Sequence, residues 1–104
     1  MKRTDMETIV IITACTNPFG KYWEFREKES GQVLAEVDKK KEKEFGPGPL
    51  YFVYTQSGGT LCESARRRKK DSAMEFAKQS ICEQFAGVDV KFKMNVMVKH
   101  YKWS

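Results

Sequence analysis

Several short stretches of the chain alternate between apolar and polar residues, which is the pattern of a β-strand with one buried face. Residues 8–16 are rich in β-branched side chains and end at the turn signal Asn17-Pro18-Phe19-Gly20. Residues 22–28 and 33–38 alternate on either side of Ser30-Gly31 and predict a β-hairpin with one apolar face. The first third of the chain is therefore expected to form three strands.

A second hairpin is predicted after a charged loop. The loop, at about residues 39–49, holds the mixed charge run 39–44 and two Gly-Pro pairs. We expect it to be mobile and solvated, because the acids in the run dilute its positive charge; an arm that gathers anions is the alternative. Strands are then expected at residues 50–56 and 60–65, joined by the turn Ser57-Gly58-Gly59.

One helix is expected to begin at Asp71 or Ser72, both good N-cap residues, and to end at about Ala86. Gly87 follows directly and is a typical residue for ending a helix. Phe76 lies off the apolar stripe of this helix; we expect it at the margin of the sheet, with a surface contact residue as the alternative. The stripe, at spacings of three and four residues, consists of Met74, Ala77, Ile81 and Phe85.

Residues 88–103 alternate throughout and are expected to form one long strand, or two strands broken near Asn95. This length exceeds the usual strand of about 5–6 residues. The strand is therefore strongly bent, or its far end pairs outside the domain, for example in a homodimer. Its polar face carries lysines and aromatic residues, namely Lys91, Lys93, Lys99, Tyr101 and Trp103.

The order of these elements is β-β-β-β-β-α-β, which is typical of the α+β class. We expect a curved antiparallel sheet of five to six strands with one helix packed across one face. The chain has 104 residues, of which 40% are hydrophobic and 12% aromatic. This is the size and apolar content of a single domain, 1–104, with one core.

The formal net charge of +5 is concentrated toward the C-terminus, where residues 66–104 contain ten Lys/Arg and four Asp/Glu. The run Arg66-Arg67-Arg68-Lys69-Lys70, called the basic run below, directly precedes the predicted helix. Positive charge at a helix N-terminus opposes the helix dipole, so helix stability does not explain the run. An anionic partner would explain it, although a solvated loop is also tolerated.

Two basic surfaces therefore predict a binding module for nucleic acid. The basic run would contact phosphates, while the lysines and aromatic residues of the last strand would track a backbone and stack on bases. The alternative for the last strand is an ordinary solvated sheet surface, with Trp103 covering a neighbouring edge. The expected binding residues are Arg66, Arg67, Arg68, Lys69, Lys70, Lys91, Lys93, Lys99, Tyr101 and Trp103.

The stretch 48–85 consists of a hairpin, the basic run and then Lys70-Asp71-Ser72-Ala73-Met74-Glu75-Phe76-Ala77. It resembles the second half of a double-stranded-RNA-binding domain, a family in which lysines entering the last helix hold phosphates. The first helix of that family is missing here, and a strand follows where the family domain ends. In outline, strands followed by one helix are also similar to the Pur and Whirly single-strand binders.

A second hypothesis is a small inhibitor or adaptor, of the kind that phages and mobile elements encode, which binds a host protein. It is based on the short chain, the long last strand and aromatic residues expected at the surface, such as Tyr22. Such a protein would place its basic surface on an acidic partner, or its last strand on a sheet edge.

Candidate catalytic groups are sparse, so we expect no enzyme, no cofactor and no metal site. Cys15, Cys62 and Cys82 are odd in number and widely separated, without a CxxC pair. His100 is the single histidine, so a Cys–His nucleophile pair would form only by chance of the fold. Unpaired thiols fit a reducing compartment.

No targeting or membrane segment is expected. Met1-Lys2-Arg3 followed by Ile12-Thr13-Ala14-Cys15 is superficially similar to a bacterial lipoprotein signal. However, the apolar run is short, and Asp5 and Glu7 interrupt its approach. No stretch approaches the roughly 18 apolar residues of a membrane span. We therefore expect a cytoplasmic protein whose partner is nucleic acid or an acidic protein surface.

Overall fold

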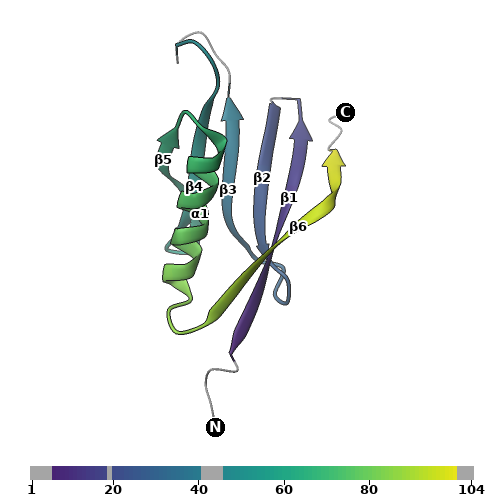
Figure 1. Cartoon of the computed structure of the whole chain (residues 1–104), viewed down its shortest axis with the longest axis vertical. Helices are drawn as coiled ribbons and strands as arrows, with labels where there is room; N and C mark the ends of the chain where they lie inside the picture. The colour runs from purple at the N-terminus through teal and green to yellow at the C-terminus, as the bar shows by residue number, and fades with distance from the viewer. Residues whose placement is uncertain (1–5, 19, 41–45, 101–104) are drawn as a thin grey trace.

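The computed structural model describes residues 6–18, 20–40 and 46–100, with side chains described through Asn95. Seven elements follow one another in the predicted order (Figure 1). They are β1 (Glu7–Asn17), β2 (Gly20–Glu27), β3 (Val33–Lys40), β4 (Leu50–Ser57), β5 (Thr60–Arg67), α1 (Lys70–Gln84) and β6 (Asp89–His100).

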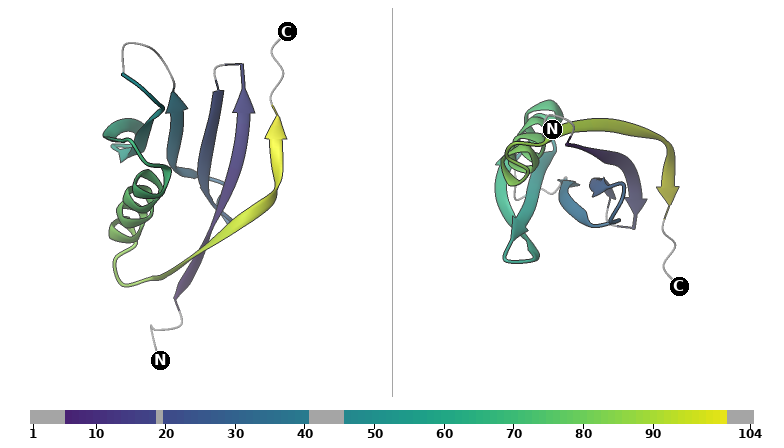
Figure 2. Two further views of the ribbon diagram at one scale, coloured as in Figure 1. Left: turned by 45° about the horizontal axis from the view of Figure 1, so that its top comes forward. Right: turned by 90° about the horizontal axis from the view of Figure 1, so that it is seen from below.

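The six strands form one curved sheet in the spatial order β5-β4-β3-β2-β1-β6 (Figure 2). The first five strands form an antiparallel meander, whereas β6 pairs with β1 in parallel. In such a meander β1 and β5 run in the same direction. The helix α1 then carries the chain back to the other end of the sheet, so β6 runs in the direction of β5 and hence of β1. The predicted α+β fold is confirmed, and its sheet is mixed rather than wholly antiparallel.

The last segment forms a single strand at an outer edge of this sheet. β6 has 12 residues and follows β1 along nearly its whole length. Its register with β1 shifts just after the pair Thr13–Asn95, which is where the sequence predicts a break. At this shift, Asn95 Nδ2 donates a hydrogen bond to Thr13 Oγ1 at 3.3 Å. The strand β6 therefore continues past the register shift instead of breaking there.

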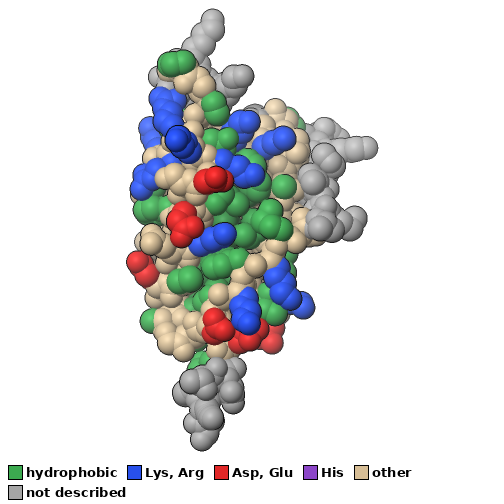
Figure 3. Space-filling model, viewed as in Figure 1, with side chains coloured by type: hydrophobic (Ala, Val, Ile, Leu, Met, Phe, Trp, Pro, Cys, Tyr) green, Lys and Arg blue, Asp and Glu red, His purple; other side chains and the backbone are tan. Residues whose placement is uncertain are grey.

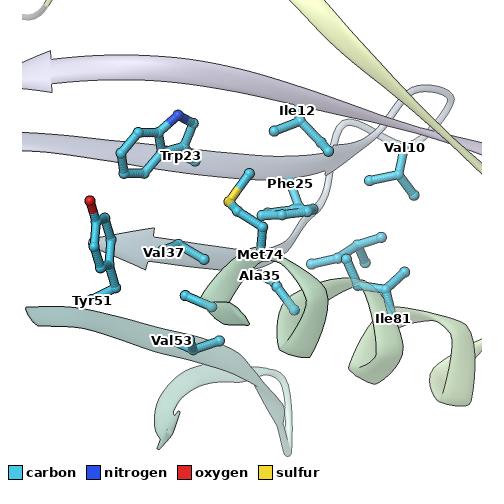
Figure 4. Close-up of a cluster of buried hydrophobic side chains, with 13 residues drawn as sticks. Val10, Ile12, Trp23, Phe25, Ala35, Val37, Tyr51, Val53, Met74 and Ile81 are labelled. Carbon is cyan, nitrogen blue, oxygen red and sulfur yellow. The ribbon is translucent and has the colours of Figure 1, made fainter. Parts of the chain in front are cut away.

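The core lies between α1 and the sheet face that it covers, where α1 packs on β3, β4 and β5. Alternate residues of neighbouring strands, such as Phe25, Val37 and Val53, point toward Met74 and Ile81 of the helix (Figure 4). Burying an apolar side chain of this kind contributes about 1.5–3 kcal/mol. The apolar faces of the strands and the apolar stripe of the helix therefore pack together in one core, as the sequence predicts.

The helix boundaries differ from the prediction at both ends. α1 begins at Lys70 and ends at Gln84. Met74, Ala77 and Ile81 of the predicted stripe are buried, while Phe85 lies just beyond the helix and is partly buried against the core. Phe76 is likewise partly buried against the core, in agreement with its expected place at the margin of the sheet.

Candidate nucleic-acid interface

The basic run leaves β5 and enters α1, and its cations lie on different faces of the sheet. Arg66 pairs with Phe52, and Arg67 pairs with Tyr51, on the neighbouring strand β4. The Arg66 guanidinium lies 2.6 Å from a Glu63 carboxylate oxygen and 4.6 Å from the centre of the Phe52 ring. The Arg67 guanidinium lies 5.1 Å from the centre of the Phe76 ring. Arg66 and Arg67 are thus packed against aromatic rings and are not surrounded by water alone.

Phe52, near the start of β4, lies on the sheet face opposite α1 and contacts two of the cations. Its two chain neighbours, Tyr51 and Val53, belong to the core, so the Phe52 side chain points to the other face. It is only 4% exposed there, and the Lys40 ammonium lies 4.8 Å from its ring centre. Contacts of cations with aromatic faces contribute roughly 0.5–2 kcal/mol, depending on solvent exposure. Phe52 therefore holds both Lys40 and Arg66 near the end of β3.

Among the described residues, no side chain caps the start of α1. Lys69 occupies the N-cap position with extended backbone and makes no capping hydrogen bond, and Asp71 lies inside the first turn. The predicted N-cap at Asp71 or Ser72 is therefore wrong. The Lys70 ammonium lies 4.9 Å from the centre of the Trp23 ring, and this contact holds the first helical residue against the sheet. An uncapped helix N-terminus presents backbone N–H groups and a positive dipole end, which favour anions.

The sheet adds three lysines that sequence reasoning missed. β3 runs through Lys40, so Lys39 and Lys40 belong to a strand and not to the predicted loop; residues 41–45 of that loop lie outside the described residues. Lys39 pairs with Tyr51, which in turn pairs with Arg67. Lys21 enters from the start of β2. The alternation of residues 33–38 stops at Asp38, because Lys39 and Lys40 are both charged, so no signal in the sequence indicates that the strand includes them.

Eight basic residues consequently share one end of the sheet with the N-terminus of α1. Figure 3 shows Lys and Arg side chains gathering toward the end of the molecule where α1 begins. We call this surface the basic end, and it comprises Lys21, Lys39, Lys40, Arg66, Arg67, Arg68, Lys69 and Lys70.

Acidic groups border the basic end on the face opposite α1. Glu36 on β3 stands between Glu24 on β2 and Tyr54 on β4. Burial, together with the neighbouring carboxyl groups of Asp38 and Glu24, raises the pKa of Glu36 to about 8. Asp38 Oδ1 is buried and has no hydrogen-bond partner among the described residues, while protonated Glu36 can donate a hydrogen bond to the Asp38 carboxylate. The Glu36 carboxyl group is therefore largely protonated and uncharged at neutral pH.

The lysines of β6 have a different environment. Lys91 Nζ lies 4.0 Å from a carboxylate oxygen of Glu7 and 4.0 Å from one of Asp89. Lys93 is exposed beside Ile11 of β1. Since β5 and β6 are the two outer strands of the sheet, these lysines and the basic run lie at opposite edges. The structure does not join them into one surface.

Three of the predicted binding residues lie beyond the described side chains. Lys99 has only its backbone described, in register with Cys15, and Tyr101 and Trp103 lie outside the described residues. Their part in base stacking stays a prediction.

The thiols and acids show no metal-binding arrangement in the described part of the chain. Cys15 is buried and its Sγ lies 3.6 Å from the Thr13 carbonyl oxygen, while Cys62 and Cys82 are exposed. Within the described ranges, no group of three or more His, Cys, Asp or Glu side chains could hold a metal ion. The one helix of those ranges, α1, is too short to cross a membrane.

No protein-family model, no curated protein and no solved structure matches this chain. The hairpin β4–β5 followed by the basic run and α1 has the element order of the second half of a double-stranded-RNA-binding domain. That resemblance stays a prediction based on layout.

Proposed function

We propose that this chain is a non-enzymatic nucleic-acid-binding module that contacts phosphate groups through its basic end. The observation that supports the proposal is the gathering of eight Lys and Arg residues, on both faces, at the end of the sheet where α1 begins without a capping side chain among the described residues. Phosphates accept hydrogen bonds from Lys, Arg and backbone N–H groups at such positions, independently of base sequence.

Several of these cations are held in place before any ligand binds. Lys40 and Arg66 lie over Phe52, Arg67 over Phe76 and Lys70 over Trp23. A side chain that is already ordered loses less conformational entropy on binding, so the basic end is preorganised for a polyanion. Glu63 is the one acid that an ion pair joins to the basic end among the described residues, and Arg66 is its partner.

The test is the salt dependence of affinity for labelled single-stranded DNA, single-stranded RNA and duplexes of equal length. The logarithm of the binding constant should fall linearly with the logarithm of salt concentration between 50 and 200 mM, because each phosphate contact releases counterions. The double variant Arg68→Ala/Lys69→Ala should weaken binding about tenfold and lower the slope by about 2.

The matched control is Lys91→Ala/Lys93→Ala, which removes the same charge from the opposite edge of the sheet. It should leave both affinity and slope nearly unchanged. No binding at 50 mM salt, or an affinity that salt does not change, would contradict the proposal.

A protein partner is the second candidate function, in the manner of a phage-type inhibitor or adaptor. It is favoured by β6, whose outer edge pairs with no described strand and whose Met94 is 57% exposed. Such an edge can accept a strand from another chain, including a second copy in a homodimer. A monomeric protein that recovers no stoichiometric partner from lysate would count against this candidate.

We further propose a reducing compartment such as the cytoplasm, because the three cysteines are free. Mass measurement of the protein isolated from its native cells, with thiols blocked at lysis, tests the compartment: three blocked thiols are expected.

A further inference from the structure

A pocket opens at the basic end between the start of β2 and the end of β3, next to the turn after β1. Its volume is about 180 Å³, and its lining includes Gly20, Tyr22, Asp38 and three lysines, Lys21, Lys39 and Lys40. Pockets for drug-sized ligands measure about 300–1,000 Å³. This pocket is smaller, as a site for a phosphate group with part of a sugar would be.

Gly20 shapes this pocket. Its backbone φ is +137°, and a Cβ atom on it would lie 3.2 Å from the Lys39 carbonyl oxygen. Glycine adopts positive φ without strain, so it lets the turn after β1 approach the β3 backbone closely. The close approach of the β2 and β3 backbones thus shapes the pocket, and a surface loop is not needed to form it.

The charge of the pocket favours a dianion. Lys21 is exposed, Lys39 is half-buried, and Lys40 is fixed with its ammonium 4.8 Å from the Phe52 ring centre. Among the described residues of the lining, Asp38 is the one carboxylate, so the three lysines exceed it by two charges. A terminal phosphate carries about −1.5 to −2 at neutral pH, whereas a phosphate inside a nucleic-acid strand carries one charge. The pocket therefore matches the end of a strand better than its interior.

We infer that this pocket binds the terminal phosphate of a nucleic-acid strand. The inference rests on the proposed function, because the rest of the strand would lie on the basic end. Lys39 is two strands away from Arg67, or about 10 Å at the usual strand spacing, so a strand ending in the pocket continues over the basic run. Tyr22 provides an aromatic wall for the terminal nucleoside, and Asp38 accepts a hydrogen bond from its O–H or N–H groups.

The experiment compares one oligonucleotide with a 5′-phosphate, with a 3′-phosphate and with hydroxyl groups at both ends. One phosphorylated form should bind about 5–10-fold more tightly than the hydroxyl form. Lys21→Ala/Lys39→Ala should abolish this preference. Arg68→Ala/Lys69→Ala, which removes the same charge, should weaken all three ligands by one factor and keep the preference.

The outcomes separate this inference from the proposed function. If no oligonucleotide binds, both fail. If all three bind equally well, or if Lys21→Ala/Lys39→Ala keeps the preference, the terminal-phosphate pocket is wrong while the proposed function stands. Amide NMR checks the location, because the Gly20 N–H resonance should shift with the preferred phosphorylated ligand and not with the hydroxyl form.

Discussion

The basic end and the β6 lysines are both positive in the sequence, but the fold gives them different surroundings. At the basic end, four cations from β3, β5 and α1 lie over Phe52, Phe76 and Trp23, at the end of the sheet where α1 begins. On β6, Lys91 lies 4.0 Å from each of two carboxylates, on Glu7 and Asp89. The first arrangement concentrates positive potential, while the second neutralises it locally.

This comparison shows that the neighbours of a charged residue decide whether it contributes to a binding surface. Glu7 is 84 positions from Lys91 in the sequence, yet the parallel pairing of β1 with β6 places the two together. Lys39 and Lys40 are interspersed with acids in the sequence, yet the meander places them at the same end of the sheet as Arg66 and Arg67, with β4 between. Four predictions test the contrast, in order of decreasing effect.

The largest effect is expected from removing the ring that supports the basic end. Phe52→Ala should lower the free energy of unfolding by about 3 kcal/mol, because Phe52 is nearly fully buried and two cations lie over its ring. At about 4–8 °C per kcal/mol, thermal denaturation should show a Tm lower by 12–24 °C. Met94→Ala on β6 is the control and should change stability by less than about 0.5 kcal/mol, since Met94 is largely exposed. Equal losses in the two variants would contradict the supporting role of Phe52.

Charge reversal should separate the two regions in binding. Arg68→Glu/Lys69→Glu should weaken oligonucleotide affinity roughly 100-fold at low salt, because repulsion replaces attraction next to the phosphates. Lys91→Glu/Lys93→Glu changes the net charge by the same amount and should weaken affinity less than about threefold. Fluorescence anisotropy measures both, and a larger loss for the β6 variant would reverse our assignment.

The carboxyl pair beside the basic end should make stability depend on pH. The pKa of Glu36 is about 8 in the folded protein and 4.5 without the environment of the fold. Below pH 4.5 the group is protonated in both states; as pH rises toward 8 the unfolded state ionises first, so stability falls. Glu36→Gln should remove this fall and stabilise the protein at pH 8 by about 1 kcal/mol, a value reduced for the partial exposure of the group.

Chemical denaturation of both proteins at pH 5 and pH 8 measures the effect. The wild-type protein should be less stable at pH 8 than at pH 5, and Glu36→Gln should show a smaller difference. A steeper fall in the variant would show that Glu36 is ionised in the folded protein at neutral pH.

The smallest effect is expected on β6. Lys91→Ala should change the free energy of unfolding by less than about 0.5 kcal/mol, because the lysine is half-exposed and its two carboxylates lie at the limit of ion pairing. Arg26→Ala provides a contrast, since Arg26 lies 2.9 Å from the buried Glu24 and should cost more. Urea denaturation resolves the difference, and a greater loss for Lys91→Ala would show that the β6 contacts matter.

The fold was largely predictable, because its signals are local. Alternation in residues 22–28 and 33–38 indicates strands whatever their partners, and Met74, Ala77 and Ile81 fall on one face of a helix by spacing alone. The start of α1 was less predictable, because the contact of Lys70 with Trp23 overrides the capping preference of Asp71.

The candidate site was predictable only in part. The basic run is contiguous, so its charge is visible in the sequence. Lys21, Lys39 and Lys40 join it through strand pairing, and no local pattern states which strand pairs with which. The pocket depends further on the close approach of Gly20 to the Lys39 carbonyl, which is a property of two paired strands.

The sequence by itself determined six strands, one helix, the composition of the core and the positive charge before α1, because these follow from spacing and composition along the chain. Only the tertiary structure decided that β6 lies parallel to β1, that its lysines meet acids, and that three other lysines join the basic run. Pairing between distant strands sets these neighbours, and the alternation within a strand defines its two faces but not its partner.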